Sequence, residues 1–225
     1  MNKNKGIFIV VEGIDGAGKS TQIKNITEYI SRICPDRKVI LTREPGGTNN
    51  PLGEKIRDLL LNNKMEDHTR TLLYAASRYE HQIKIKKWLD KGFIVICDRY
   101  IYSSMAYQGY TEGQLDYIMS INAYEEIAIP DYVLHLDVSF DTYLKRKAKR
   151  LSERELDELE KKGDKFFKKN IDMYDKTYKH IIELSDVYDM LGIDIKVPEI
   201  HKIDSNKSIK ETRKHIEQTL NTIFK

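Results

Sequence analysis

Residues 13–20, with the sequence GIDGAGKS, constrain the fold more than any other part of the chain. They match the pattern G-x-x-x-x-G-K-[ST], and they lie between an apolar run (residues 6–13) and a segment with helical spacing (residues 18–31). In a strand–loop–helix unit of this kind, glycines let backbone N–H groups surround a phosphate, and the start of the helix adds its positive dipole end. We therefore expect a phosphate-binding loop for ATP or GTP, with Lys19 on phosphate oxygens and the Ser20 hydroxyl on Mg²⁺.

Short apolar runs rich in Ile and Val alternate with segments of helical spacing. The apolar runs are residues 6–13, 38–44, 93–100, 131–138 and, more weakly, 200–205. The helical segments are residues 18–31, 51–62, 67–91, 112–126, 139–150, 164–184 and 208–224. Unbroken hydrophobicity is typical of strands covered on both faces, so the pattern predicts an α/β fold in three layers, a five-stranded parallel sheet flanked by helices. No Pro/Gly-rich boundary divides the chain, and we expect one domain over residues 1–225.

Charge is unevenly distributed along the chain. The net charge is only +3, but residues 145–169 carry eleven Lys/Arg against six Asp/Glu, a local excess of +5. Residues 145–163 are nearly all polar and can bury little surface, so we expect a short mobile segment there. A charge run of this kind is most often a solvated helix surface, and the alternative is a cationic lid over an anionic ligand. Residues 186–199 are expected to form a second, irregular insert.

The compartment can be predicted from the cysteines and the N-terminus. Cys97 ends an apolar run, so it is expected in the core rather than in a disulfide with Cys34. No run reaches the length of a membrane span, and the N-terminus has no long apolar region with a cleavage site. We expect a soluble, cytoplasmic protein.

Arginines follow the predicted strands or lie on adjoining helices, where ligands bind in open α/β sheets. Arg43 lies near the end of the second apolar run and Arg99 near the end of the third. Tyr74 and Arg78 are four residues apart and share one helix face. Taken singly, each is compatible with ordinary packing or a salt bridge. Beside a phosphate loop, they favour a second anionic substrate, because arginine binds phosphate in a bidentate fork.

Taken in order, the motifs resemble those of the thymidylate kinase family, in the nucleoside monophosphate kinase group of P-loop kinases. The matching stretches are FIVVEGIDGAGKSTQ, TREPGGT, the Tyr-x-x-x-Arg pair, DRY and AYQG. The match is dense in the first half of the chain and thinner afterwards. The resemblance implies ATP-dependent phosphorylation of dTMP to dTDP in dTTP synthesis, with Mg²⁺ as cofactor. It also implies a homodimer formed through helices such as 51–62 and 67–91.

The resemblance also assigns residues to sites. The ATP-binding set is Gly13, Ile14, Asp15, Gly16, Ala17, Gly18, Lys19, Ser20, Thr21, Arg146 and Arg150. The dTMP-binding set is Asp15, Arg43, Pro45, Tyr74, Arg78, Arg99, Ser103, Ser104, Tyr107 and Gln108. The catalytic set is Asp15, Lys19, Arg99 and Arg150, and the metal set is Ser20 and Asp98.

Within the acceptor set, the resemblance implies separate roles for the sugar phosphate and the base. Asp15 reaches the 3′-OH or a metal-bound water, and Arg43 and Arg99 hold the acceptor phosphate. At the base, Tyr74 stacks on thymine, Arg78 donates to thymine O4, and Ser103 and Ser104 line the base edge. At the sugar, Tyr107 excludes a ribose 2′-OH.

Members of this family meet the γ-phosphate of ATP with an arginine from the phosphate loop or from the lid. Here Gly16 follows Asp15, so the lid is expected to supply that cation. Arg146, Arg150 and Arg154 have i, i+4, i+8 spacing and share one face if residues 143–157 are helical. Arg150 is the favoured candidate. The sequence departs from the family's D-R-x-E lid pattern, since it reads DELE at residues 157–160, and the choice among the lid arginines stays open.

Two other functions remain compatible with the sequence. One is a kinase for another nucleoside monophosphate, such as dUMP, or for a deoxynucleoside; Arg43 and Arg99 favour a charged acceptor. The other is a non-catalytic nucleotide-binding or nucleic-acid-binding module that uses the basic segment, which offers no aromatic residue for base stacking before Phe166. No N-K-x-D motif supports guanine recognition. We therefore expect ATP and dTMP as partners, and neither nucleic acid nor membrane.

Overall fold

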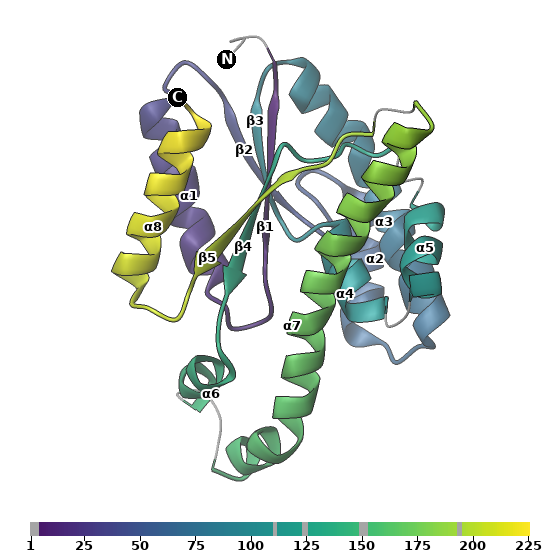
Figure 1. The fold of residues 1–225 in the computed structure, drawn as a ribbon, viewed down its shortest axis with the longest axis vertical. Helices are drawn as coiled ribbons and strands as arrows, with labels where there is room; N and C mark the ends of the chain where they lie inside the picture. Colours follow the sequence, from purple (N-terminus) through teal and green to yellow (C-terminus); the bar gives the residue numbers. More distant parts are fainter. Residues whose placement is uncertain (1–4, 110–111, 123–125, 149–152, 193–194) are drawn as a thin grey trace.

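Parallel strands form the centre of the molecule. The structure, a computed structural model, describes residues 5–109, 112–122, 126–148, 153–192 and 195–225. The strands are β1 (Ile7–Glu12), β2 (Val39–Arg43), β3 (Ile94–Asp98), β4 (Tyr132–Asp137) and β5 (Glu199–Asp204). They form one five-stranded sheet in the order β2-β3-β1-β4-β5, and every neighbouring pair is parallel (Figure 1). The predicted parallel sheet is confirmed.

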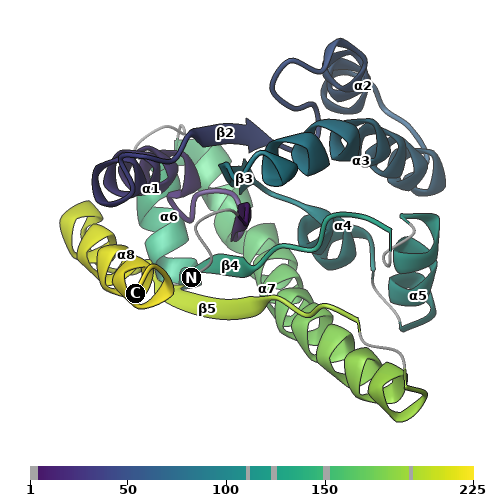
Figure 2. The ribbon, with the colours of Figure 1, turned by 90° about the horizontal axis from the view of Figure 1, so that it is seen from above.

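Helices cover both faces of the sheet. In chain order they are α1 (Lys19–Ile33), α2 (Pro51–Asn62), α3 (Asp67–Asp90), α4 (Ile101–Gln108), α5 (Glu112–Ile121), α6 (Phe140–Ala148), α7 (Glu153–Met190) and α8 (Ile209–Ile223). Figure 2 shows α1 and α8 on one side of the sheet and α3, α4 and α7 on the other. The arrangement is the three-layer P-loop NTPase fold that the sequence predicts.

The first five residues of β1 are apolar, which suits a strand in the middle of the sheet. Every residue of β1 is buried, because strands flank it on both edges and helices cover both faces. The register aligns Val11 of β1 and Arg43 of β2 with Asp98 of β3. The carboxyl ends of these strands therefore meet at one edge of the sheet, where the phosphate loop leaves β1.

Two helices differ from the sequence-based expectation. Residues 101–108 form α4, although the sequence indicated only a cluster of polar and aromatic residues there. Helix α7 begins at Glu153 and ends at Met190, so it takes in part of the expected polar segment and the start of the insert at 186–199. Glu, Lys, Arg and Leu are strong helix formers, which accounts for helix in a segment whose sequence is nearly all polar. Residues 149–152, and with them Arg150, lie outside the described residues.

Both cysteines are unpaired thiols, with Cys97 buried in β3 and Cys34 partly exposed after α1. Among the described helices, none combines the length and the apolar character needed to span a bilayer.

Candidate active site

A cleft of about 1070 Å³ opens where the carboxyl ends of the central strands meet. Its walls come from the phosphate loop, the segment after β2, helices α2, α3, α4 and α5, the end of α6 and the start of α8. The expected site residues that line it are Asp15, Gly16, Gly18, Lys19, Ser20, Thr21, Arg43, Pro45, Tyr74, Arg78, Asp98, Arg99, Ser103, Ser104, Tyr107, Gln108 and Arg146. The loop residues Gly13, Ile14 and Ala17 are buried behind this surface.

The phosphate loop is closed around the amino group of Lys19. Gly13, Gly16 and Gly18 have φ angles of 134°, 86° and 98°, in the region that residues with a Cβ rarely adopt. The Nζ of Lys19 donates to the carbonyl oxygens of Gly13 at 2.8 Å and Ile14 at 2.9 Å. Burial, and secondarily the charge of Arg99, lowers the pKa of Lys19 to about 8. A phosphate in the loop would restore the full positive charge.

Asp15 and Arg99 form an ion pair across the mouth of the loop. Arg99 Nη2 lies 2.6 Å from Asp15 Oδ1, and the Asp15 side chain is 79% exposed. Burial alone would raise the pKa of Asp15, but the charges of Arg99 and Lys19 outweigh it, so the pKa lies below its usual range. The Arg99 guanidinium carbon also lies over the Tyr107 ring, 5.4 Å from its centroid. The anionic carboxylate and the cationic guanidinium thus meet where two substrates would converge.

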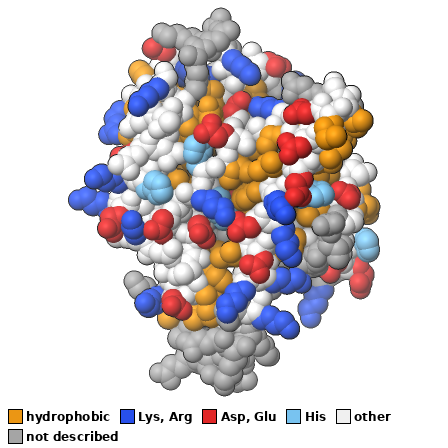
Figure 3. Space-filling model, viewed as in Figure 1, with side chains coloured by type: hydrophobic (Ala, Val, Ile, Leu, Met, Phe, Trp, Pro, Cys, Tyr) orange, Lys and Arg blue, Asp and Glu red, His pale blue; other side chains and the backbone are white. Residues whose placement is uncertain are grey.

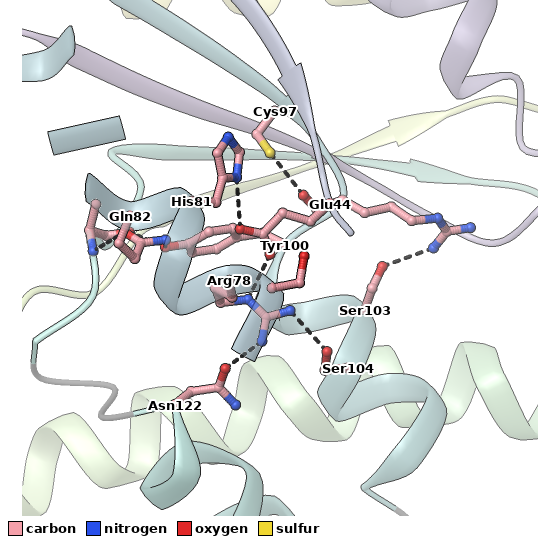
Figure 4. Close-up of polar contacts among 12 residues, drawn as sticks. Glu44, Arg78, His81, Gln82, Cys97, Tyr100, Ser103, Ser104 and Asn122 are labelled. Carbon is pink, nitrogen blue, oxygen red and sulfur yellow. Dashed lines mark hydrogen bonds and ion pairs between the residues drawn. The ribbon is translucent and has the colours of Figure 1, made fainter. Parts of the chain in front are cut away.

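Arg78 is held by partners on three sides. Its side chain is 2% exposed, and Nε donates to Glu44 Oε2 at 2.7 Å, Nη1 to Asn122 Oδ1 and Nη2 to Ser104 Oγ at 3.0 Å (Figure 4). These bonds use part of the five N–H donors of a guanidinium. Tyr74 lies one helical turn earlier on the same face of α3 and also lines the cleft. The Tyr74 ring and the Arg78 guanidinium, which can only donate hydrogen bonds, therefore lie side by side.

The Glu44 carboxylate that binds Arg78 is also hydrogen-bonded to His81, which contacts Thr42. His81 Nδ1 lies 3.2 Å from Glu44 Oε1, and His81 Nε2 lies 2.8 Å from Thr42 Oγ1. A carboxylate only accepts, so His81 donates from Nδ1 to Glu44, and a neutral His81 then accepts at Nε2 from the Thr42 hydroxyl. Thr42 Oγ1 in turn accepts the backbone N–H of Thr48. This chain of hydrogen bonds ties the loop after β2 to Arg78.

Two of the residues expected to bind ligands, Asp98 and Gln108, each carry a buried oxygen that can accept a hydrogen bond. Asp98 Oδ1 and Gln108 Oε1 are buried, and neither has a hydrogen-bond partner within the described part of the chain. Both residues line the cleft, as does Ser20. A carboxylate oxygen and a serine hydroxyl are hard oxygen ligands, so Asp98 and Ser20 fit a Mg²⁺ ion that is also bound by nucleotide phosphates.

The basic end of α6 lies on the phosphate loop. Arg146 Nη1 donates to the Gly16 carbonyl at 3.1 Å, and Nη2 donates to the Ser205 carbonyl. A Cβ on Gly16 would lie 3.0 Å from the Tyr143 ring, so a side chain larger than hydrogen would press on α6 there. Lys147 also lines the cleft. Of the expected lid cations, Arg146 is the one that the structure describes at the loop.

Several residues at the site were not singled out from the sequence. They are Glu12, Glu44, Asn122, Lys147 and Ser205, together with Tyr174, which was considered only as a residue bordering the site. Glu12 carried a readable signal, because a glutamate that ends an otherwise apolar strand needs buried partners. Asn122 carried none, because its contact with Arg78 depends on how α5 packs.

Comparisons with known proteins agree with this geometry. The family model for thymidylate kinase matches residues 11–216. The chain belongs to the thymidylate kinase family. It is 41% identical over 170 residues to the thymidylate kinase of Enterococcus faecalis, covering 72% of this chain and 77% of that protein. It is 38% identical over 227 residues to the thymidylate kinase of Ureaplasma parvum, covering 98% and 92%.

The fold is also that of a solved thymidylate kinase. The crystal structure of the enzyme from Ehrlichia chaffeensis superposes with a TM-score of 0.64 and 29% identity, covering 96% of this chain and 99% of the other. Thymidylate kinases are transferases that bind ATP and phosphorylate dTMP to dTDP. Family membership therefore does not favour the alternatives of a kinase for another nucleotide or a non-catalytic binding module.

Proposed function

We propose that this chain transfers the γ-phosphoryl group of ATP to dTMP, with ATP on the phosphate loop and dTMP between Arg99 and Arg78. The observation that carries the proposal is the layout of one cleft. The loop with Lys19 forms one end, the Tyr74 and Arg78 pair forms the other, and Asp15 and Arg99 lie between them. An anion site and a base site joined by an arginine suit a nucleoside monophosphate as acceptor.

The polarity of the base site supports thymine. Arg78 can only donate hydrogen bonds, which suits the O4 carbonyl of thymine and opposes the exocyclic amino group of cytosine. The buried Oε1 of Gln108 is an acceptor for the N3–H of the same base. Tyr74 supplies the stacking ring, and the hydroxyls of Ser103 and Ser104 face the arginines at this end of the cleft. Tyr107 beside Arg99 would occupy the space of a ribose 2′-OH.

Catalysis in this proposal is positioning and charge neutralisation, because the acceptor phosphate is already a nucleophile. Arg99, with Arg43, draws the acceptor phosphate toward the loop, and Asp15 exchanges its bond with Arg99 for one to the sugar 3′-OH or a water. Lys19 neutralises charge on the transferred group. Ser20 and Asp98 would hold Mg²⁺, which would supply further positive charge to the phosphates.

The lid supplies the remaining cation in this proposal. Residues 145–163 close over ATP within the single domain of residues 1–225, and Arg150 meets the γ-phosphate. The position of Arg146 at the Gly16 carbonyl supports this, because it brings the basic end of α6 to the loop. Charged side chains of both signs are interspersed on the face shown in Figure 3, which gives no support to a nucleic-acid surface there.

We also propose a homodimer that acts in the cytoplasm. Helices α2 and α3 carry exposed apolar side chains, namely Leu52, Leu59, Leu61, Leu72, Tyr79 and Ile83. A second copy of the chain would cover them. The free thiols of Cys34 and Cys97 suit a reducing compartment.

An ADP-release assay with ATP and Mg²⁺ tests the proposed reaction when dTMP, dUMP, dCMP, dGMP and thymidine are compared as acceptors. We expect turnover with dTMP, weaker turnover with dUMP, and background rates with the other three. Background rates with dTMP, or dCMP turned over as well as dTMP, would overturn the proposal.

A further inference from the structure

Glu12 is a buried carboxylate at the carboxyl end of β1, immediately before the phosphate loop. Its Oε1 accepts from the backbone N–H groups of Tyr100 at 2.8 Å and Ser103 at 3.1 Å. Its Oε2 accepts from the hydroxyls of Ser103 at 2.7 Å and Tyr174 at 2.9 Å. Burial raises the pKa of Glu12, and the charge of Arg99 and the hydrogen bonds from Ser103, Tyr100 and Tyr174 oppose that rise. Backbone N–H groups only donate, so the arrangement suits an ionised carboxylate that accepts at both oxygens.

The backbone bonds hold the peptide that follows Arg99. Tyr100 is the N-cap of α4 and makes no side-chain cap bond, so Glu12 caps that helix from a neighbouring strand. Arg99 itself has a φ of 68°, in the left-handed region that a residue with a Cβ occupies only when its surroundings hold it there. The bond from Tyr100 N–H to Glu12 is one such restraint.

The side-chain bonds hold the guanidinium. A serine hydroxyl has one proton, and Ser103 donates it to Glu12, so its lone pairs face Arg99. Arg99 Nη1 donates to this oxygen at 2.8 Å. The Tyr174 hydroxyl, 3.0 Å from Ser103 Oγ and 3.4 Å from Arg99 Nη1, closes the group. Glu12 therefore fixes Arg99 through both its backbone and its side chain.

We propose that Glu12 is a positioning residue for the acceptor phosphate, which it serves by holding Arg99 in the orientation that faces the phosphate loop. The proposal rests on the proposed function, since Arg99 is there the group that binds the dTMP phosphate. Glutamine at this position keeps the shape but directs an NH₂ donor at two donors. In one orientation of the amide, the N–H groups of Tyr100 and Ser103 lose their acceptor. In the other, the amide donates to Ser103 Oγ, which then accepts from the amide as well as from Arg99.

Calorimetric titration of Glu12→Gln with dTMP and, separately, with ATP tests the proposal. We expect the Kd for dTMP to rise about tenfold, because a hydrogen-bonded charge has lost its support, while the Kd for ATP changes by less than about twofold. Glu183→Gln on the exposed side of α7 is the matched control and should change neither. If Glu12 only stabilised the fold, Glu12→Gln would lower the Tm without weakening dTMP binding more than ATP binding. Equal Kd values for dTMP in Glu12→Gln and wild type would overturn the proposal.

A double-mutant cycle with Arg99→Lys tests the route of the effect. We expect Glu12→Gln to weaken dTMP binding by less than about twofold in the Arg99→Lys background, because the group it positions is gone. The same tenfold loss in both backgrounds would contradict the assignment. If Glu12→Gln does not fold, Tyr174→Phe, which removes one of the two hydroxyls bonded to Glu12 Oε2, replaces it in the cycle. Its expected effect is a rise of about threefold in the Kd for dTMP, and no rise would overturn the proposal. Turnover of dTMP by the wild type tests the proposed function separately.

Discussion

At the scale of single residues, Arg78 shows how a buried cation becomes a selective donor. Replacing it with lysine removes the fork that reaches Glu44, Asn122 and Ser104 together and leaves Glu44 with a weaker partner. We expect Arg78→Lys to lower the free energy of unfolding by about 2 to 4 kcal/mol and to raise the KM for dTMP about tenfold. Urea unfolding and steady-state kinetics measure both. Arg213→Lys, at a partly buried ion pair with Glu217 on α8, is the control. A KM for dTMP equal to the wild type in Arg78→Lys would refute this role.

Lys19 offers a second test at this scale. With a pKa of about 8 in the free enzyme, the amino group is partly deprotonated near pH 8, and bound phosphates raise that pKa. We therefore expect ATP binding at pH 8 to take up about half a proton and to weaken as the pH rises further. Calorimetry in buffers of different ionisation enthalpy measures the uptake. Lys19→Arg should abolish it, because arginine stays charged; equal uptake in that variant would assign the proton elsewhere.

The sequence predicted these residues unevenly. Motif spacing predicted a cleft lined by Lys19, Arg78 and Arg99, because local spacing and strand ends determine where those side chains lie. It did not reveal that Arg78 is fixed by Glu44 and Asn122, since those contacts depend on packing between distant segments. The residues that hold the arginines in place could therefore be identified only from the structure.

At the scale of elements, α6 and the lid are expected to serve ATP rather than dTMP. Arg150→Ala should lower kcat at least about a hundredfold with a KM for dTMP within about twofold of wild type, because the arginine acts on charge that develops in the transition state. Arg146→Ala should instead raise the KM for ATP, since Arg146 is bonded to the loop carbonyl of Gly16. Lys145→Ala, at an exposed position on α6, is the control. An unchanged kcat in Arg150→Ala would remove Arg150 from the mechanism.

Packing of α7 on the sheet makes stability depend on pH. His135 of β4 is buried against Tyr174 and Tyr178, and burial, with a contribution from Lys202, lowers its pKa to about 4. The unfolded chain binds a proton near pH 6.5 and the folded chain only near pH 4, so stability falls as the pH drops through that window. We expect a loss of about 3 kcal/mol between pH 7 and pH 4.

Urea unfolding at pH 7 and pH 4 measures this loss. His135→Gln keeps a polar side chain beside Tyr178 but cannot become charged, so its stability should fall much less over the same interval. A pH dependence in His135→Gln equal to that of the wild type would show that other groups cause the loss.

Element boundaries were predictable where hydrophobic periodicity was strong. The strands coincide with short apolar runs that are strongest in β1 and β3 and weakest in β5, and each was located from the sequence within a few residues. Helix α4 was missed because its start depends on Glu12, which lies far away in the sequence. The length of α7 was underestimated because a polar stretch gives no periodic signal even where helix propensity is high.

At the scale of the whole molecule, α2 and α3 present the surface expected between two copies. Ile83→Glu places a charge among the exposed apolar side chains of α3, where Ile83 is 53% exposed. We expect wild type to sediment as a dimer and Ile83→Glu to shift toward the monomer. Ile182→Glu, at a similarly exposed isoleucine on α7, should leave the dimer unchanged. A monomeric wild type would contradict the proposed dimer.

The central claim is that a loop for ATP and a base site for dTMP share one cleft and exchange a phosphoryl group. Chromatographic quantification of all nucleotides after incubation with ATP, Mg²⁺ and dTMP tests it most directly. The account predicts that one dTDP forms for each ADP released, and that both products vanish together when dTMP is omitted. ADP released without dTDP, or at the same rate without dTMP, would contradict it.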